Sequence, residues 1–343
     1  MGNLILEIPL TEMRYWWILF SCSCFANVLG LNISSAFDSA VTIYILIPVL
    51  VIPQLIMSGV VINFDKFNPD VSRPNGIPLM GEAMVSRWAF EAFMVTQFKD
   101  NPYEKIFFEL DQKEKVSSYK ANFLLRTLET KLSDVVHLRD HWRDKNSVQL
   151  NAALALLREE IGYEMKLWDR DALPLIDGLE AGKFDSTVYK DTKEFLHLLQ
   201  KFYVKREGDA KNERQRLESE RTDTDEKALQ FRKFQMIYAN DNVKAWVENA
   251  MEARIAEWHG RLIQKSYPIY FTDHRPRNYF DFQAAFYVPT KHFMGRYYDT
   301  FYFNVTVIWI ITAVLYMALY FDLLKKLVQR LSNRIKYRKK NLL

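Results

Sequence analysis

Three long segments of this chain contain no charged side chain. They span residues 15–37, 39–64 and 300–321. A helix of about 20 residues crosses the hydrocarbon core of a bilayer, which is roughly 30 Å thick, and each segment is long enough. A buried helix of a soluble protein can also be apolar, but three such runs favour membrane spans. We therefore expect an all-α membrane protein with three transmembrane helices, although the mean hydropathy of −0.19 is that of a soluble chain.

The basic residues predict the orientation of these helices. Eight lysines and arginines follow residue 321, together with a single acidic residue, Asp322. Basic residues beside a membrane helix favour the cytoplasmic side. We expect a basic cytoplasmic tail at 322–343 and an extracytoplasmic region at 65–299, in a multi-pass protein of the plasma membrane or bacterial inner membrane. The tail also resembles a nucleic-acid patch, but its position favours anionic lipid, so no nucleic-acid partner is predicted.

The region between the second and third runs changes character along its length. Residues 65–98 read as a turn-rich loop and then an amphipathic segment, LMGEAMVSRWAFEAFMVTQF, which predicts a re-entrant or interfacial helix or an ordinary surface helix. Residues 99–266 are charged and predict a large extracytoplasmic helical insertion. Within it, residues 205–227 are polar all round and predict a solvated helical arm or a mobile connection. Residues 267–299 are aromatic-rich and membrane-proximal.

Three stripes of apolar residues at helical spacing support the insertion being helical. They are Leu124, Leu128, Leu132, Val135 and Val136; Leu150, Leu154, Leu157, Ile161 and Met165; and Trp246, Ala250, Ile255 and Trp258.

The N-terminal residues do not read as a signal peptide. Residues 1–14 lack a basic start and a cleavage site. The segment GNLILEI reads as the end of an earlier membrane helix, so residues 1–64 would hold that end and two transmembrane helices. We expect a truncated chain or a start at an internal methionine. Cys22 and Cys24 lie two residues apart and do not face each other on a helix, so no disulfide is expected.

No residue pattern predicts catalysis by this chain alone. His137 and His141 share a helix face, but leucine follows the first histidine, where a metalloprotease motif has glutamate. A solvated charged face is the simpler interpretation. The sequence has no phosphate-binding loop of the form G-x-x-x-x-G-K-[ST]. We expect no metal and no cofactor in this chain, so ATP and Mg²⁺ would have to bind another polypeptide or a missing segment.

Two motifs carry a resemblance to a known family. SGVVINF, residues 58–64, is followed by a turn and then by SRWAFEAFMVTQF, residues 86–98. This order resembles the fifth membrane helix and the re-entrant segment of ABC transporter permeases of the G subfamily, and more broadly the type-two exporter permease domain. That family's motif R-[YW]-[AG]-F-E-A-[LF] matches residues 87–93 at each position, through Arg87, Trp88, Phe90 and Glu91 among others.

The resemblance covers approximately residues 1–98 and 297–331. It implies that the three helices are the fourth, fifth and sixth of six. The chain departs from the family in its long segment 99–299, where the family has a much shorter loop, and in lacking the first helices and the ATP-binding domain.

The resemblance also implies roles for four apolar residues. Val60 and Val61 would form the external gate, although leucines, which are bulkier, are common there in the family. Ile52 and Leu55, one to two turns below, would line the substrate cavity. The alternative is that all four pack against neighbouring helices.

The prolines are interpreted from the residues themselves. Pro48 and Pro53 predict a kinked helix, whose freed carbonyls need neighbouring helices or cavity water as partners. Gln54 is plausible facing a bundle or cavity, and Gly59 permits a close approach at the outer end of the helix.

Together these patterns predict the C-terminal part of the permease domain of an ABC-type exporter. It would supply cavity wall and external gate for ATP-driven transport. The implied partners are a nucleotide-binding domain, separate or missing, a second permease half in a dimer, membrane lipids and a periplasmic partner. The rival is a membrane-anchored sensor or scaffold that works through its extracytoplasmic helical domain. It explains the size of that domain but not RWAFEAF or the prolines. A membrane hydrolase has no convincing nucleophile.

Overall fold

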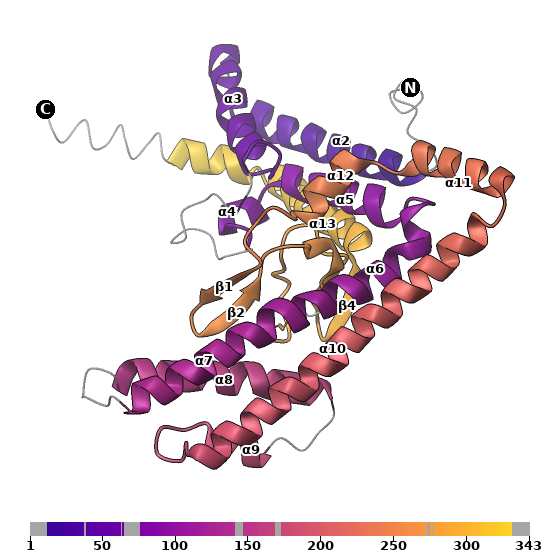
Figure 1. Ribbon diagram of the computed structural model, residues 1–343. Helices are drawn as coiled ribbons and strands as arrows, with labels where there is room; N and C mark the ends of the chain where they lie inside the picture. The colour runs from indigo at the N-terminus through magenta and orange to yellow at the C-terminus, as the bar shows by residue number, and fades with distance from the viewer. Residues whose placement is uncertain are drawn as a thin grey trace, which may run out of the picture. The chain divides into compact units, whose positions relative to one another are not determined.

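The computed structural model describes residues 12–37, 39–62, 64, 76–140, 147–168, 173–272, 275–276 and 278–330. The chain divides into two compact units, residues 1–101 with 274–343 and residues 102–273, which are described in turn (Figure 1). The predicted end of an earlier helix, the 65–75 loop, His141 and most of the basic tail lie outside the described residues.

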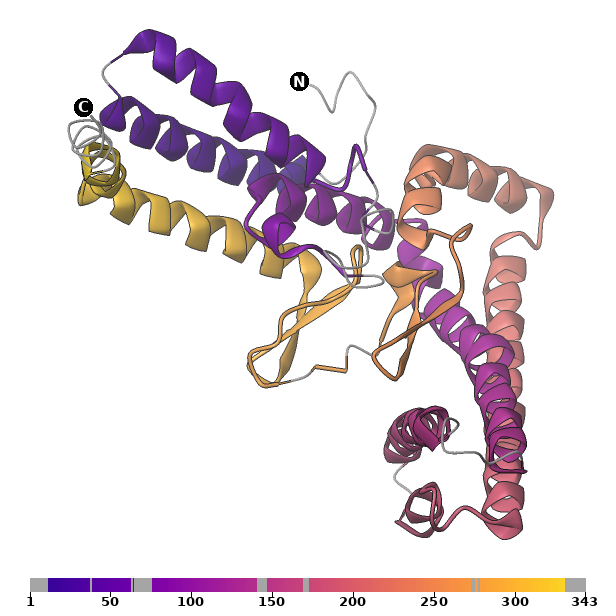
Figure 2. The ribbon, with the colours of Figure 1, turned by 90° about the vertical axis from the view of Figure 1, so that its left-hand side faces the viewer.

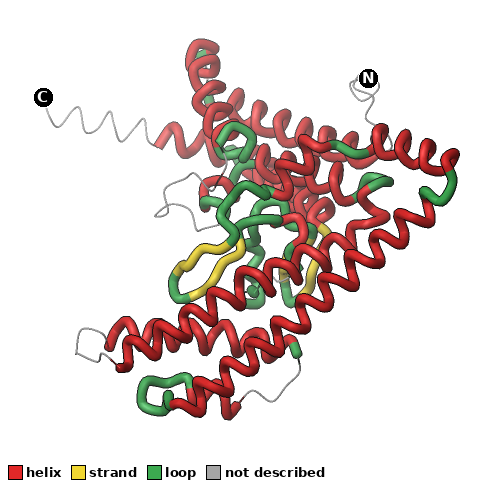
Figure 3. Tube along the Cα trace, viewed as in Figure 1, coloured by secondary structure: helices red, strands yellow, loops and turns green. Residues whose placement is uncertain are grey.

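The described part of the chain is mainly helical, but the expectation of a purely helical chain is wrong in two places (Figure 3). β1 (Ile255–Trp258) pairs antiparallel with β2 (Arg261–Gln264), and β3 (Thr290–Phe293) pairs antiparallel with β4 (Arg296–Asp299). The third predicted stripe is therefore not helical, because its last two residues lie in β1. Ile255 and Trp258 are three residues apart, a spacing that also fits one face of a helix. A segment of four residues therefore cannot show from its apolar spacing whether it is a helix or a strand.

Two helices of the first unit are long and apolar enough to cross a membrane. They are Met13–Ala36, within α2 (Glu12–Ala36), and α13 (Thr300–Tyr320). α3 (Ala40–Ile56) is apolar but has 17 residues and ends well before residue 64. The third predicted span therefore remains a prediction. α2 and α13 pack side by side, as Figure 2 shows, and the Asn32 amide donates to the carbonyl of Leu315 at 3.0 Å.

The amphipathic segment forms two helices, α4 (Leu79–Glu82) and α5 (Val85–Lys99), and α5 packs against both α2 and α13. Its apolar core includes Trp88 and Ala92 from α5, Ile18 from α2, and Phe301 and Ile308 from α13. Because residues on most sides of α5 are buried, the interpretation as an ordinary surface helix is not supported.

The second unit is built from helices that follow one another along the chain. They are α6 (Glu104–Tyr119), a π-helical turn (Lys120–Leu124), α7 (Leu125–Asp140), α8 (Ser147–Leu167), α9 (Leu173–Gly178), α10 (Ser186–Arg221), α11 (Asp225–Tyr238) and α12 (Asp241–Glu248), before β1, β2 and a 3₁₀ turn at Pro268–Tyr270. α10 packs along α6 and α7, and α7 packs on α8.

The core of the second unit confirms the first two apolar stripes. Their members on α7, its preceding π-helical turn and α8 are buried together, with Val136 partly buried at the edge. Residues 205–221 continue α10 as a helix, so the polar segment is a helical arm for most of its length rather than a mobile connection. The Asp185 carboxylate caps the start of α10 by accepting from the amides of Thr187 and Val188.

Candidate functional site

α3 carries Ile52 and Leu55, which the resemblance assigns to the cavity, and the gate residues Val60 and Val61 lie in the turn after its end at Ile56. Pro48 and Pro53 both lie inside this helix, as predicted. Each lacks the amide that would donate to the carbonyl four residues earlier. No residue of α3 is buried, and Ile52 and Leu55 are both 53% exposed. Among the described residues these two side chains are therefore largely uncovered, and α3 presents an apolar surface.

The turn after α3 has a defined geometry that depends on Ser58 and Gly59. The Ser58 hydroxyl donates to the carbonyl of Leu55 at 2.7 Å and accepts from the amide of Val60 at 3.1 Å. Gly59 adopts φ +82°, which favours glycine. A Cβ atom at this position would lie 2.6 Å from the ring of Phe286. The close approach predicted at Gly59 is therefore confirmed, while Val60 stays exposed.

Replacing Gly59 with alanine is expected to destabilise the protein by about 2 kcal/mol, because a side chain at positive φ is strained and also meets the Phe286 ring. Thermal unfolding of the full chain in detergent measures the change. Gly30→Ala is the matched control, since Gly30 lies in α2 and its Cβ would meet nothing within 4 Å. Equal melting temperatures for the two variants would contradict the prediction.

The two motifs that carry the resemblance both lie against Phe286, and α5 is hydrogen-bonded to α3. The Ser86 hydroxyl, in α5, donates to the carbonyl of Gln54, in α3, at 2.6 Å. The ring of Phe90 lies 6.3 Å from that of Phe286, which covers Gly59. The serine–glycine turn and the RWAFEAF helix thus share one aromatic contact.

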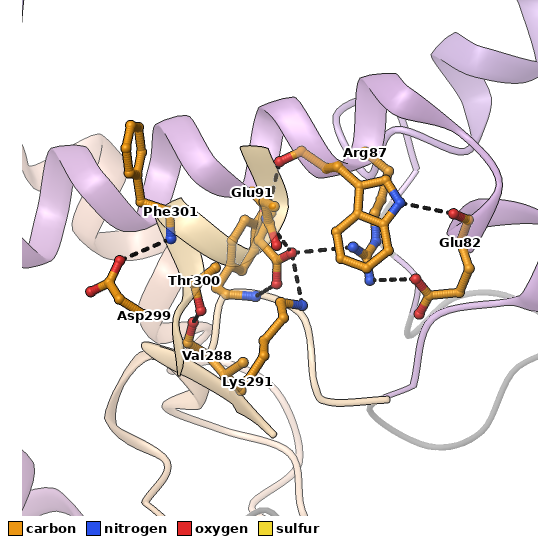
Figure 4. Close-up of polar contacts among 11 residues, drawn as sticks. Glu82, Arg87, Glu91, Val288, Lys291, Asp299, Thr300 and Phe301 are labelled. Atoms are coloured by element: carbon orange, nitrogen blue, oxygen red, sulfur yellow. Dashed lines mark hydrogen bonds and ion pairs between the residues drawn. The ribbon is translucent and has the colours of Figure 1, made fainter. Parts of the chain in front are cut away.

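A cluster of buried charges lies on a neighbouring face of α5 (Figure 4). Arg87 and Glu91 are one helical turn apart, and their side chains are 1% and 0% exposed. The Arg87 guanidinium lies 3.3 Å from a Glu91 carboxylate oxygen and 2.9 Å from a Glu82 carboxylate oxygen. Burial of unpaired charge is costly, so this arrangement needs a second cation to balance Glu82 and Glu91.

Lys291 of β3 supplies that cation. Its Nζ lies 3.0 Å from Oε2 of Glu91, and its side chain is fully buried. The same carboxylate oxygen accepts from the Asn304 amide of α13 at 2.8 Å, and Oε1 accepts from the Tyr287 backbone amide at 3.2 Å. Glu91 therefore joins α5, the β3–β4 hairpin, its preceding loop and α13.

The donors around Glu91 favour its ionised form. Burial alone raises the pKa of this carboxyl group, but Lys291, Arg87 and the Asn304 amide outweigh it and hold the pKa below its ordinary value. With two cations and two carboxylates, the cluster is electrically neutral when all four groups are charged.

Trp88 packs against this cluster. Its ring lies 3.6 Å from the Arg87 guanidinium carbon and 5.1 Å from the Lys291 ammonium, so both cations contact a π face. The indole N–H donates to the carbonyl of Glu82 at 2.8 Å. The cluster is thus a packed and hydrogen-bonded connection between helices, which holds α5 in place.

Two further ion pairs lie at the C-terminal end of α5. Arg14 of α2 pairs with Asp100, and Lys99 pairs with Asp299, the residue that caps α13. Both pairs tie the end of α5 to the starts of the two candidate spans.

The second unit has a separate group of buried acids. The pKa of Glu104 is raised to about 7, mainly by burial; Asp111 and Glu248 also raise it, while Lys244 and Arg214 lower it. Asp111 accepts from the Arg214 guanidinium at 2.8 Å. The described residues contain no group of three His, Cys, Asp or Glu side chains able to hold a metal.

Sequence reasoning found part of this site and missed part of it. It identified Arg87, Trp88 and Glu91, which the structure brings together. It missed Lys291 and Asn304. Two signals in the sequence could have found them. Lys291 is a lysine in an aromatic segment, and Asn304 is an asparagine in the first turns of an apolar run. A polar side chain in such a run costs free energy unless it has a hydrogen-bond partner.

Comparisons with protein-family models, with curated proteins and with solved structures found no match. The resemblance of residues 58–64 and 86–98 to an exporter permease therefore remains a prediction.

Proposed function

We propose that this chain is the C-terminal part of the permease domain of an ABC-type exporter in the plasma membrane. The observation that supports this most is that the two resembling segments share a contact with Phe286. The ring of Phe286 lies against both Phe90 and Gly59, and the Ser86–Gln54 hydrogen bond joins the RWAFEAF helix to α3. A gate at the end of an apolar helix requires such a support behind it.

The proposed roles come from the resemblance, and the exposure of the four side chains supports them. Val60 and Val61 form an apolar external gate, and Ile52 and Leu55 line the substrate cavity below it. Apolar side chains that the described residues leave exposed call for an apolar neighbour, which a second permease half or lipid supplies. In this proposal α3 is the third span, kinked by its prolines, residues 65–299 are extracytoplasmic and the tail is cytoplasmic. ATP and Mg²⁺ bind a partner domain.

The test is ATP-dependent extrusion of amphipathic dyes from proteoliposomes that hold the full assembly. Val60→Trp and Val61→Trp are expected to lower extrusion by at least about tenfold, equivalent to about 1.4 kcal/mol in barrier height, because a bulky ring keeps the pathway closed. Val60→Ala and Val61→Ala are expected to increase passive leak. ATPase activity is measured in parallel to show whether transport stays coupled to ATP hydrolysis.

Val41→Trp is the matched control, because Val41 is an exposed valine in the first turn of α3, far from the gate. It is expected to leave extrusion and ATPase activity unchanged. The gate assignment is wrong if none of the four gate variants alters extrusion, leak or coupling.

The compactness of the second unit favours a rival proposal. Residues 102–273 have their own hydrophobic core, as a membrane-anchored sensor or scaffold would require. The reading frame upstream of Met1 separates the two proposals. A phosphate-binding loop and an ABC signature encoded there support the exporter, and a different domain supports the sensor.

A further inference from the structure

The β3–β4 hairpin joins α13 without a linker. The last strand residue, Asp299, is also the helix cap, and its carboxylate accepts from the amide of Phe301 at 3.0 Å. The hydroxyl of Thr300 donates to the carbonyl of Val288 at 2.6 Å, and its amide donates to the carbonyl of Pro289 at 3.1 Å. The hairpin therefore has a set direction relative to the helix.

The β3–β4 hairpin points across the axis of α13. In Figure 2, α2 runs alongside α13, whereas β3 and β4 extend sideways from the N-terminal end of α13. If α13 crosses a bilayer, a hairpin that leaves its end sideways runs along the membrane surface. A hairpin that continued the helix direction would instead lead away from it.

The hairpin is covered on one strand and open on the other. β3 is covered, because Lys291 and His292 are buried and Phe280 packs 6.2 Å from Phe293. β4 and the turn are exposed, with Tyr297 55% accessible. The exposed apolar and aromatic side chains of this region are Tyr279, Phe280, Met294, Tyr297, Tyr298 and Tyr302.

We propose that the turn and β4 form an interfacial anchor that lies in the headgroup region of the bilayer entered by α13. Tyrosine is enriched at this depth because its ring is apolar and its hydroxyl is polar. Arg296, which is exposed beside the turn, supplies a cation for lipid phosphate and has a long apolar stem that tolerates partial immersion. The inference rests on the proposal that α13 spans a membrane.

Spin labels measure this placement in the full chain. Cys22 and Cys24 are replaced with alanine, single cysteines are placed at Met294 or Tyr297, and the protein is reconstituted in nanodiscs of phosphatidylcholine and phosphatidylglycerol. Accessibility to oxygen, which concentrates in lipid, is compared with accessibility to a water-soluble nickel chelate. Ile310→Cys, at an exposed position in the middle of α13, is the lipid reference, and Met251→Cys, at a fully exposed position of the second unit, is the water reference.

The anchor predicts a several-fold lower nickel accessibility at Met294 and Tyr297 than at Met251, with oxygen accessibility between the two references. Nickel accessibility equal to that at Met251 overturns the anchor. Protection from both reagents also overturns it, because protein then covers the hairpin. If Ile310 itself is open to nickel, α13 does not span and the proposed function fails. If Ile310 is lipid-exposed and the hairpin is not, the anchor alone fails.

Discussion

Replacing Lys291 with methionine is expected to lower the free energy of unfolding by about 3 to 5 kcal/mol. The methionine has a similar length but no charge, so Glu91 stays buried with one of its two cations removed. The cluster then carries a net negative charge in a site with no access to water. Unfolding of the full chain in detergent micelles, followed by circular dichroism, measures the loss.

A double variant separates lost charge balance from lost packing. Lys291→Met combined with Glu91→Gln leaves the Arg87–Glu82 pair and no net charge. The double variant is expected to lose less free energy of unfolding than the two single variants lose together. Lys183→Met is the control for removing a paired lysine, because the Lys183–Glu180 pair is exposed and is worth at most about 1 kcal/mol. A purely additive double variant would contradict the proposed coupling.

Replacing Glu104 with glutamine is expected to remove a pH-dependent contribution of about 3 kcal/mol to the free energy of unfolding. The pKa of Glu104 is about 7 in the folded protein against an ordinary value of 4.5. Between these values the folded state binds more protons than the unfolded state, so the contribution of this group to stability falls as pH rises. The contribution is fully present below pH 4.5 and is lost as pH rises through 7.

The glutamine variant removes this titration. Its free energy of unfolding should be close to that of wild type at pH 4.5 and higher than that of wild type at pH 8. Chemical unfolding of the full chain at both pH values measures the difference. Asp111 and Glu248 remain in both proteins, so the difference isolates Glu104. Glu109→Gln, an exposed position on the same helix, should show no such change. A difference between Glu104→Gln and wild type that stays constant from pH 4.5 to 8 would rule out the assignment.

The sequence predicted the helical elements best where the signal is local. The stripe that includes Leu128 and Leu132 recurs every three to four residues, and a helix places such residues on one face. That face is buried in the second unit. The α13 span, Thr300–Tyr320, nearly matches the uncharged run at 300–321. Both predictions needed only neighbouring residues.

The strands were missed for a related reason. Ile255 and Trp258 are three apart, which fits a helix face as well as it fits a four-residue strand, and β1 is stable only because β2 pairs with it. Met294 and Gly295 both have positive φ at the β3–β4 turn, as a two-residue hairpin requires. The sequence carries glycine at only one of these positions, so the turn signal was weak.

The sequence by itself determined the uncharged runs, the helical periodicity and the one-turn spacing of Arg87 and Glu91, because each depends on residues a few positions apart. Only the tertiary structure decided that Lys291, two hundred positions after Glu91, is its partner, because the β3–β4 hairpin and α13 bring that lysine to the face of α5. It also decided that Ile52 and Leu55 are exposed among the described residues. Burial depends on what packs against a residue, and no local pattern encodes that.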